Sequence, residues 1–303
     1  MRFKNLDLNL LVALNYFLTE RNVSRAAEKM FISQSAASNA LSRLRLYFND
    51  EILVQVGKQM ELTPRALELV EPVRNILVSI ESQIIHQDAY DPIKQKVKFS
   101  ISVSDYTLST LVPKILQYIE SKQYLIELDF QPQSFNPIKT LDQGDADLLI
   151  IPQNFISENH PSEVLFAENF VCIASKNHPT VQTELSLKDF KQQKHIIMQP
   201  DVHTDSYESQ IIKSLKIKRD VAVTSYNFSI IPELIAKSHH LAILHKSLAL
   251  KFQQFYEINI FELPFDLPEM KQSIQWHRLR KNDARIIFFI EMLQKICQKN
   301  YNY

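Results

Sequence analysis

Short hydrogen-bonding side chains gather along one side of residues 34–48, where the apolar spacing predicts an α-helix. At about 100° per residue, Ser35, Asn39 and Ser42 fall opposite the apolar stripe. Solvated helix faces usually carry Glu and Lys, whereas short polar side chains near a helix N-terminus suit base edges in the DNA major groove. From periodicity alone, a solvated helix of an all-α domain remains an equal alternative. The candidate DNA contacts on this helix are Gln34, Ser35, Ser38, Asn39, Ser42, Arg43 and Arg45.

The neighbouring residues predict the elements that would position this polar face. Ser33 is expected to cap the helix, and Ser24 to cap a shorter helix over residues 24–30. An earlier amphipathic helix is expected to end near Arg21-Asn22. The apolar stripe expected to face the core consists of Ala37, Leu41, Leu44 and Phe48.

Residues 52–62 read as two short strands joined at Gly57-Lys58. Gly57 and Gly144 are the only glycines in the 303 residues, and so scarce a residue is expected where a positive φ is needed. A hairpin at this point is a wing, which would bring Lys58 near a phosphate backbone. The wing therefore favours DNA binding over the plain solvated helix.

Charge gives modest support to this interpretation. The formal net charge of the chain is zero, which is a mild argument against nucleic-acid binding. Residues 1–60, however, carry eight Lys or Arg against five acids, a local excess of +3, and no acid lies between Lys29 and Asn49. Because phosphate contact is local, a basic face of this size is sufficient for the hypothesis.

This region resembles the winged helix-turn-helix of LysR-type transcriptional regulators, in the branch with nodulation, aromatic-degradation and leucine-operon-linked regulators. The resemblance rests on S-R-A-A-E at 24–28, S-Q-S-A-A-S-N-A at 33–40 and L-T-P-R-A at 62–66. It implies a sequence-specific DNA-binding regulator and no enzyme activity. Ser35 departs from a frequent Pro, which would change contacts at the helix start. Ser24 and Lys58 complete the candidate DNA contacts.

A long helix is expected to begin with Thr63 as its cap and Pro64 in its first turn. Its apolar residues follow the seam of a coiled coil, which favours self-association but could also pack on its own domain. Pro72 should kink or split the helix. The resemblance implies a dimerisation linker and a homodimer on a two-fold operator of double-stranded DNA. The seam consists of Ala66, Val70, Val73, Leu77, Ile80 and Ile84.

Beyond Tyr90 the pattern alternates between strands and helices, which predicts an α/β fold with mainly parallel pairing. The run L-x-x-G-x-x-D at 141–147 resembles LysR effector domains. The resemblance implies a periplasmic-binding-protein-like domain of two subdomains. The expected divisions are 1–63 for the winged helix-turn-helix, 64–90 for the linker helix, 91–303 for the effector-binding domain, about 92–168 with 266–303 for subdomain I, and about 169–265 for subdomain II. The predicted strands are 97–103, 125–130, 148–151, 170–174, 196–198, 221–223, 241–244 and 258–261.

Ligands of open α/β sheets bind at the carboxyl ends of strands, beside helix N-termini. In similar regulators the effector is often a small aromatic or organic acid. The alternative is equally open: a Ser or Asp there merely caps a helix, and Tyr226 and Phe228 belong to a core. The candidate effector contacts are Ser104, Asp105, Thr107, Asn169, His203, Thr204, Tyr226 and Phe228.

Other chemistry finds little support in the sequence. The scarcity of Gly argues against nucleotide-binding loops, Cys172 reads as an inert buried thiol, and His239-His240 with His245 lack metal-ligand spacing. No catalytic residues, cofactor, metal or membrane span are expected, and two distant cysteines fit the cytoplasm. Three hypotheses remain: a ligand-responsive DNA-binding regulator, a small-molecule-binding protein without specific DNA readout, and an enzyme on the same fold. The resemblance also implies a homotetramer formed through the α/β domains.

Overall fold

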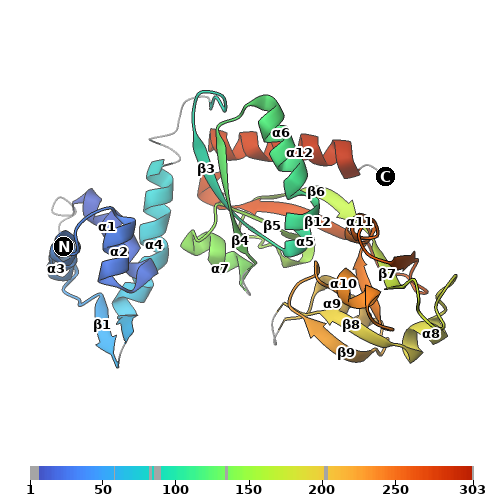
Figure 1. Ribbon diagram of the computed structural model, residues 1–303. Helices are drawn as coiled ribbons and strands as arrows, with labels where there is room; N and C mark the ends of the chain where they lie inside the picture. The colour runs from blue at the N-terminus through green and yellow to red at the C-terminus, as the bar shows by residue number, and fades with distance from the viewer. Residues whose placement is uncertain are drawn as a thin grey trace. The chain divides into compact units, whose positions relative to one another are not determined.

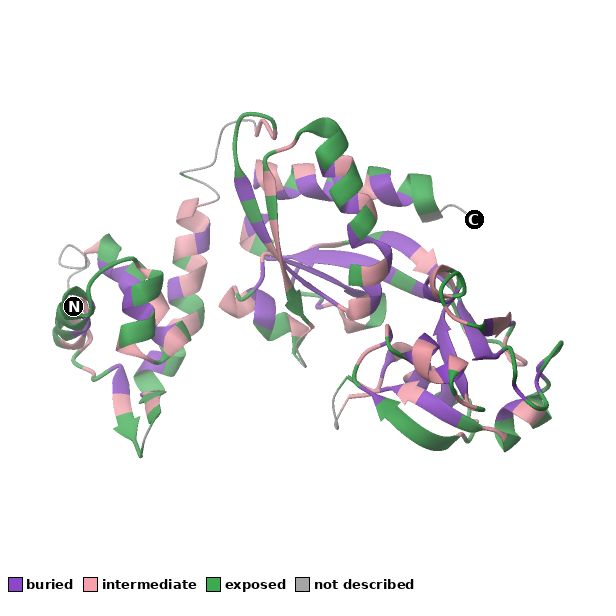
Figure 2. Ribbon diagram, in the orientation of Figure 1, coloured by how far each residue is buried: buried purple, intermediate pink, exposed green. Residues whose placement is uncertain are grey.

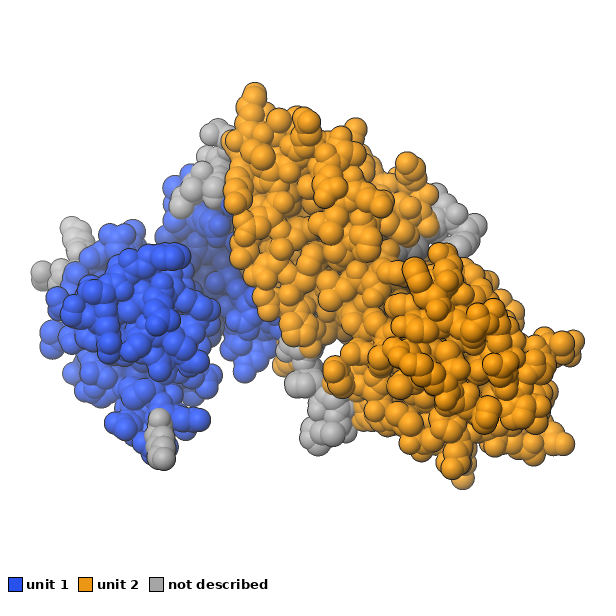
Figure 3. All heavy atoms as spheres, viewed as in Figure 1, with its two compact units in different colours: residues 1–89, 139–145, 278–286 blue, residues 90–138, 146–277, 287–303 orange. Residues whose placement is uncertain are grey.

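The computed structural model describes residues 7–57, 59–81, 84, 90–133, 136–200 and 204–301. Two of the candidate site residues, Lys58 and His203, lie outside them. The chain divides into two compact units, shown in separate colours in Figure 3. Unit 1 contains residues 1–89, 139–145 and 278–286, and unit 2 contains residues 90–138, 146–277 and 287–303.

Unit 1 begins with three helices, a two-stranded sheet and a longer helix (Figure 1). Apolar side chains of α1, α3 and α4 form its core, in which Leu14, Phe17 and Leu44 are fully buried. The predicted stripe of α3 faces this core, with Phe48 at its edge. The elements are α1 (Leu8–Glu20), α2 (Val23–Lys29), α3 (Gln34–Phe48), β1 (Leu53–Val56), β2 (Gln59–Leu62) and α4 (Pro64–Ile80).

Most of the predicted helix caps are confirmed, with one correction. Ser33 accepts a hydrogen bond from the Ala36 N–H at 3.2 Å, so α3 starts as expected. Ser24 does not cap α2, because Asn22, in an extended conformation, accepts from the Arg25 N–H at 3.0 Å. The helix therefore begins at Val23 and Ser24 lies inside it.

The predicted wing is confirmed. Strands β1 and β2 pair antiparallel from Leu53 opposite Leu62 to Val56 opposite Gln59. Gly57 follows β1 with φ +63°, a left-handed conformation that costs any other L-residue about 1 kcal/mol. The scarce glycine is thus where the backbone requires it.

Helix α4 has the predicted cap, since Thr63 accepts from the Ala66 N–H at 3.0 Å. Of the two effects predicted for Pro72, the split is wrong, because α4 continues through it from Pro64 to Ile80. Ala66 and Val73, on either side of the proline, are buried in the core of unit 1, and this packing holds the helix together. Only the first part of the predicted seam is used in this way, because Ile84 is 71% exposed.

Unit 2 contains two five-stranded sheets. In the first sheet, with order β4-β3-β5-β12-β6, β3 runs parallel to both neighbours and β12 antiparallel to both. Phe99 of β3 packs on Phe289 of α12 with ring centroids 4.5 Å apart. The elements in this part of the chain are β3 (Val97–Val103), α5 (Asp105–Thr110), α6 (Val112–Lys122), β4 (Ile126–Pro132), α7 (Pro137–Gln143), β5 (Leu148–Pro152), a 3-10 turn (Gln153–Phe155), β6 (Ser162–Glu168), β12 (Met270–Trp276), a second 3-10 turn (Arg278–Arg280) and α12 (Ala284–Tyr301). Among them, residues 139–143 of α7, the second 3-10 turn and residues 284–286 of α12 belong to unit 1.

The second sheet has the order β11-β7-β10-β8-β9. Its central strands β7 and β10 are buried along their whole length, as the purple strands of Figure 2 show. The elements are β7 (Phe170–Ser175), α8 (Leu187–Gln192), β8 (Lys194–Met198), α9 (Tyr207–Ser214), β9 (Asp220–Ser225), α10 (Ile231–Ala236), β10 (Leu241–His245), α11 (Lys246–Phe252) and β11 (Ile258–Phe261).

The α/β class is confirmed, but the expectation of mainly parallel pairing is wrong because both sheets are mixed. The chain leaves the first sheet between β6 and β7, at Asn169, and returns between β11 and β12. Parallel neighbours need a long crossover connection, usually a helix, and neither the β6–β7 passage nor the β11–β12 passage contains one. Strands β7 and β12 pair antiparallel with both of their neighbours. In the described ranges, no helix has the length and apolarity needed to span a membrane.

Candidate functional site

The polar face of α3 is open to solvent. All of its predicted DNA contacts are exposed except Arg45, which is half-buried. Ser42 donates to the Ser38 carbonyl at 3.0 Å, and the Ser35 hydroxyl lies 2.9 Å from that of Ser33. The Asn39 side chain has no protein partner among the described residues. The face therefore offers hydroxyl groups oriented by hydrogen bonds within the helix start, such as those of Ser35 and Ser42, and an unengaged amide at Asn39.

Two arginines of α3 are already engaged within unit 1. Arg45 donates to the carbonyls of Glu51 and Leu53 at 2.8 and 3.0 Å, which fixes the entry of the wing to the helix. Arg43 forms an exposed ion pair with Asp7 at 3.1 Å, a contact that the surrounding water weakens. Arg45 thus has a structural role that its position on the helix did not reveal.

The structure adds an exposed aromatic residue to this region. Phe31 lies in the turn between α2 and α3, is 96% exposed and has φ +56°. Ser24 is exposed on α2, the helix before this turn. A solvent-exposed Phe in a left-handed conformation is unusual and makes Phe31 a further candidate contact, which the sequence pattern had assigned only to a tight turn.

Unit 2 contains a cavity of about 110 Å³ lined by residues from both sheets. Three of the candidate effector contacts, Ser104, Thr204 and Phe228, line it. Thr107 is buried behind the wall, where its hydroxyl lies 3.2 Å from Ser104 Oγ and accepts from Gln272 Nε2, also at 3.2 Å. The strand-end rule therefore leads to part of the cavity.

The remaining described candidates lie elsewhere. Asp105 accepts from the N–H and hydroxyl of Ser229 at 2.7 and 2.8 Å, a contact between the two halves of unit 2. Asn169 is exposed, and its carbonyl accepts from the Lys246 N–H at 2.8 Å. Tyr226 is 79% exposed and does not line the cavity. His203 lies outside the described residues.

Four buried polar residues of the wall were not anticipated. Each is at most 5% exposed, and each keeps one polar atom without a hydrogen-bond partner among the described residues. Glu208 is in the first turn of α9 and His245 ends β10, so the strand-end rule could have found His245. The four atoms are Ser206 Oγ, Glu208 Oε2, His245 Nδ1 and Gln272 Oε1.

Burial governs the titration of these groups. It raises the pKa of the Glu208 carboxyl above its ordinary value. It also lowers the pKa of His245 to about 3, which leaves the imidazole neutral at physiological pH. Burial thus acts against the charged form of both groups.

Another buried carboxyl lies near the wall. Glu168, at the end of β6, accepts from the hydroxyls of Tyr106 at 2.6 Å and of Ser247. Burial raises the pKa of Glu168, although these hydrogen bonds oppose the shift. Tyr106 lies in α5, which comes directly after β3 of the first sheet, and Ser247 lies in α11, which comes directly after β10 of the second. Glu168 therefore connects the two sheets where the chain passes between them.

Comparison with known proteins gives matches over nearly the whole chain. A family model described as the LysR substrate binding domain matches residues 95–298, and one described as the bacterial regulatory helix-turn-helix protein of the lysR family matches residues 8–67. Nodulation protein D 3 of Mesorhizobium japonicum is 33% identical over 97% of this chain and 98% of its own length.

Two solved structures share the fold. Full-length OxyR, in a variant from Pseudomonas aeruginosa, has a TM-score of 0.76 at 17% identity, covering 97% of this chain and 95% of that one. A probable transcriptional regulator from Pseudomonas aeruginosa has a TM-score of 0.69 at 23% identity, covering 96% of this chain and 97% of that one.

Proposed function

Because this chain belongs to the LysR family of DNA-binding transcriptional regulators with an effector-binding domain, we propose that it reads a two-fold DNA operator with α3 and changes that reading when a small organic molecule fills the cavity of unit 2. The observation that carries the proposal is the exposed polar face of α3 beside the wing, with short side chains suited to base edges.

The candidate contacts divide into two roles in this proposal. Ser35 and Asn39, near the start of α3, read base edges and set specificity. Lys58 binds phosphate and contributes equally to all DNA sequences. The remaining contacts of the proposed interface are Ser24, Gln34, Ser38, Ser42, Arg43 and Arg45.

The proposal includes the assembly of the protein. Residues 1–63 act as the DNA-binding domain, 64–90 as the linker and 91–303 as the effector-binding domain, in the cytoplasm where the operator lies. On α4, Ile76 is 46% exposed, and Ile84 beyond the helix is 71% exposed, which supports pairing of two linkers in a homodimer. A homotetramer would add contacts between effector-binding domains.

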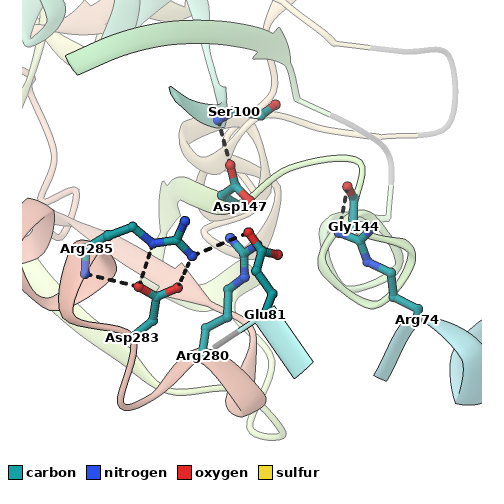
Figure 4. A network of polar contacts seen from close by, with 8 residues as sticks. All are labelled: Arg74, Glu81, Ser100, Gly144, Asp147, Arg280, Asp283 and Arg285. Atoms are coloured by element: carbon teal, nitrogen blue, oxygen red, sulfur yellow. Dashed lines mark hydrogen bonds and ion pairs between the residues drawn. The ribbon is translucent and has the colours of Figure 1, made fainter. Parts of the chain in front are cut away.

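A route from the cavity to the linker is supported by two segments of unit 1 (Figure 4). Arg74 of α4 donates to the Gly144 carbonyl at 3.0 Å. Gly144 follows α7, and Pro137 at the start of α7 lines the cavity. Asp147, at the start of β5, accepts from the Ser100 N–H at 2.9 Å and ties the next residues to β3.

The second segment follows β12, which contributes Met270 and Gln272 to the cavity wall. Arg280 pairs with Glu81, directly after α4, at 2.9 Å, and Arg285 reaches the same carboxylate at 3.4 Å. Asp283 forms an ion pair with Arg285 at 2.8 Å. Burial alone would raise the pKa of the Asp283 carboxyl, but the hydrogen bond and charge of Arg285 lower it below its ordinary value. A ligand that moves α7 or β12 would thus move the linker.

Footprinting tests the proposal. Full-length protein with DNA from upstream of its own gene should protect a two-fold site, with half-sites one helical turn or a multiple apart. Sedimentation should give a dimer or a dimer of dimers. Absence of any protected two-fold site would contradict the function, and a monomer would contradict the assembly.

A further inference from the structure

The cavity wall in unit 2 carries no positive charge on any described lining residue. The carboxyl groups among the described lining residues are those of Asp205, which pairs with Lys213 at 2.6 Å, and Glu208. Arg219 lies close enough for its charge to act on Glu208, but it donates to Ser209 Oγ at 2.9 Å and is not part of the wall. A carboxylate entering this cavity would be desolvated without a cation to compensate it.

Helix N-termini do not replace the missing cation. Such termini attract anions through their free N–H groups and dipole. Of the helices that begin at this cavity, α5 and α9 carry Asp105 and Glu208 in their first turns. Helix α7 begins with Pro137, which has no N–H. The first two N–H groups of α11 already donate to Asn169 and Glu168.

The buried polar atoms of the wall that lack partners favour a ligand that forms hydrogen bonds with them. Glu208 Oε2, Gln272 Oε1 and His245 Nδ1 are buried and unpartnered among the described residues. Leaving such atoms unpaired is unfavourable, so a ligand that donates to them would be held firmly. A carboxyl oxygen accepts a hydrogen bond whether or not the group is protonated, so Glu208 is suited to an uncharged group that donates, such as an amide.

Much of the remaining wall is apolar, and the cavity is small. Met198, Phe228 and Met270 contribute thioether and aromatic surface that packs well on a ring. The cavity has about 110 Å³, whereas an apolar cavity of roughly 150 Å³ takes up benzene. The enclosed space is therefore slightly smaller than one that takes up benzene, which limits the ligand to a single small ring.

We infer that the cavity selects an uncharged, single-ring molecule that donates hydrogen bonds and rejects carboxylates. This inference rests on the effector role proposed above, and it separates this cavity from one built for organic acids. Selection arises from Glu208, Gln272 and His245 together with the absence of a lining cation among the described residues.

Three probes of the same shape test the charge preference: benzamide, benzoate and benzamidinium. Full-length protein labelled with 13C in its methionine methyl groups is titrated with each probe. Met198 and Met270 line the cavity and should shift, while Met60 and Met292 do not line it and serve as internal controls. Benzamide should bind with a Kd of about 1 mM, and benzoate and benzamidinium at least about tenfold more weakly.

Variants test the hydrogen bonds. Glu208→Met and Gln272→Met each remove a buried acceptor of the wall and should each lower the benzamide affinity about tenfold. Glu291→Gln, on the exposed side of α12, is the matched control and should change nothing. Either of the two variants keeps the test decisive if the other fails to fold.

The inference is overturned if either charged probe shifts Met198 and Met270 at concentrations equal to or below those of benzamide, or if no probe shifts them. Operator protection is measured on the same preparation. A protein that protects its operator but prefers benzoate contradicts only this inference. A protein that protects no operator contradicts the proposed function, while the methionine shifts still decide the ligand class.

Discussion

Tyr106 stacks on His245 with ring centroids 3.7 Å apart and an angle of 12° between the ring planes. Tyr106 belongs to α5 of the first sheet and His245 ends β10 of the second. The same tyrosine donates its hydroxyl to Glu168 at 2.6 Å, at the point where the chain leaves the first sheet. One buried side chain thus joins the two halves of unit 2 through both its ring and its hydroxyl.

Tyr106→Phe keeps the ring contact and removes only the hydroxyl. Glu168 is 1% exposed and would lose one donor, so the free energy of unfolding should fall by about 1–2 kcal/mol. Urea denaturation of the full chain measures it. Tyr118→Phe is the control, since Tyr118 is only half-buried and should lose less than about 0.5 kcal/mol. Equal losses in both variants would contradict a role for the Glu168 contact.

His245→Phe should remove a pH dependence of stability. Because burial lowers the pKa of folded His245 from 6.5 to about 3, its contribution is fully present above pH 6.5. As the pH falls from 6.5 toward 3, the unfolded chain takes up the proton first, and the contribution of His245 to stability falls by about 1.4 kcal/mol per pH unit. Unfolding free energies across this range should show a shallower slope for His245→Phe. His239→Phe, at an exposed histidine, should keep the wild-type slope, and an unchanged slope in His245→Phe would refute the assignment.

Substitutions on α3 should separate DNA reading from support of the wing. Asn39→Ala and Ser35→Ala should keep the unfolding free energy within about 0.5 kcal/mol and reduce discrimination between operator and random DNA by about 1–3 kcal/mol. Arg45→Ala should destabilise the fold by about 1 kcal/mol, because two carbonyls at the entry of the wing lose their donor. Lys58→Ala should weaken binding to all DNA alike. Equal losses on operator and random DNA in all four variants would undo this division.

Gly144→Ala should disturb the contact with the linker helix. An added Cβ would lie 1.5 Å from Arg74 Cζ, and Gly144 has φ +68°. Gly57→Ala is the matched control, since its φ is +63° but nothing lies within 4 Å of the added Cβ. Gly57→Ala should cost about 1 kcal/mol of strain. Gly144→Ala should cost more and change the ligand-dependent footprint, and identical behaviour of the two variants would contradict the coupling through Arg74.

The local elements of unit 1 could be predicted because their signals are local. Ser33, the apolar stripe and the polar face define α3 over Gln34–Phe48, and Gly57 defines the wing. The start of α2 was missed because Asn22 and Ser24 are both good caps, and only the backbone conformation decides between them.

The pairing of the strands and much of the cavity could not be predicted, because they depend on residues far apart in the chain. Gln272 reaches the cavity from β12 and bonds to Thr107, 165 positions earlier. Strand β6 is half-exposed at the edge of its sheet and lacks a regular alternation of buried residues. The rule for strand ends leads to Ser104 and Phe228, which line the cavity, but not to a glutamine in the middle of a returning strand.

The position of β12 between β5 and β6 has a consequence for synthesis on the ribosome. All five strands of the second sheet lie between Phe170 and Phe261, so that sheet can close before Met270 is translated. The first sheet begins earlier in the chain but cannot be completed before β12 is translated. Until then, β5 and β6 are unpaired on the edges that β12 will occupy. The nascent chain therefore exposes unpaired, aggregation-prone strand edges until its last segment emerges. Chaperones that shield such edges would act during this interval.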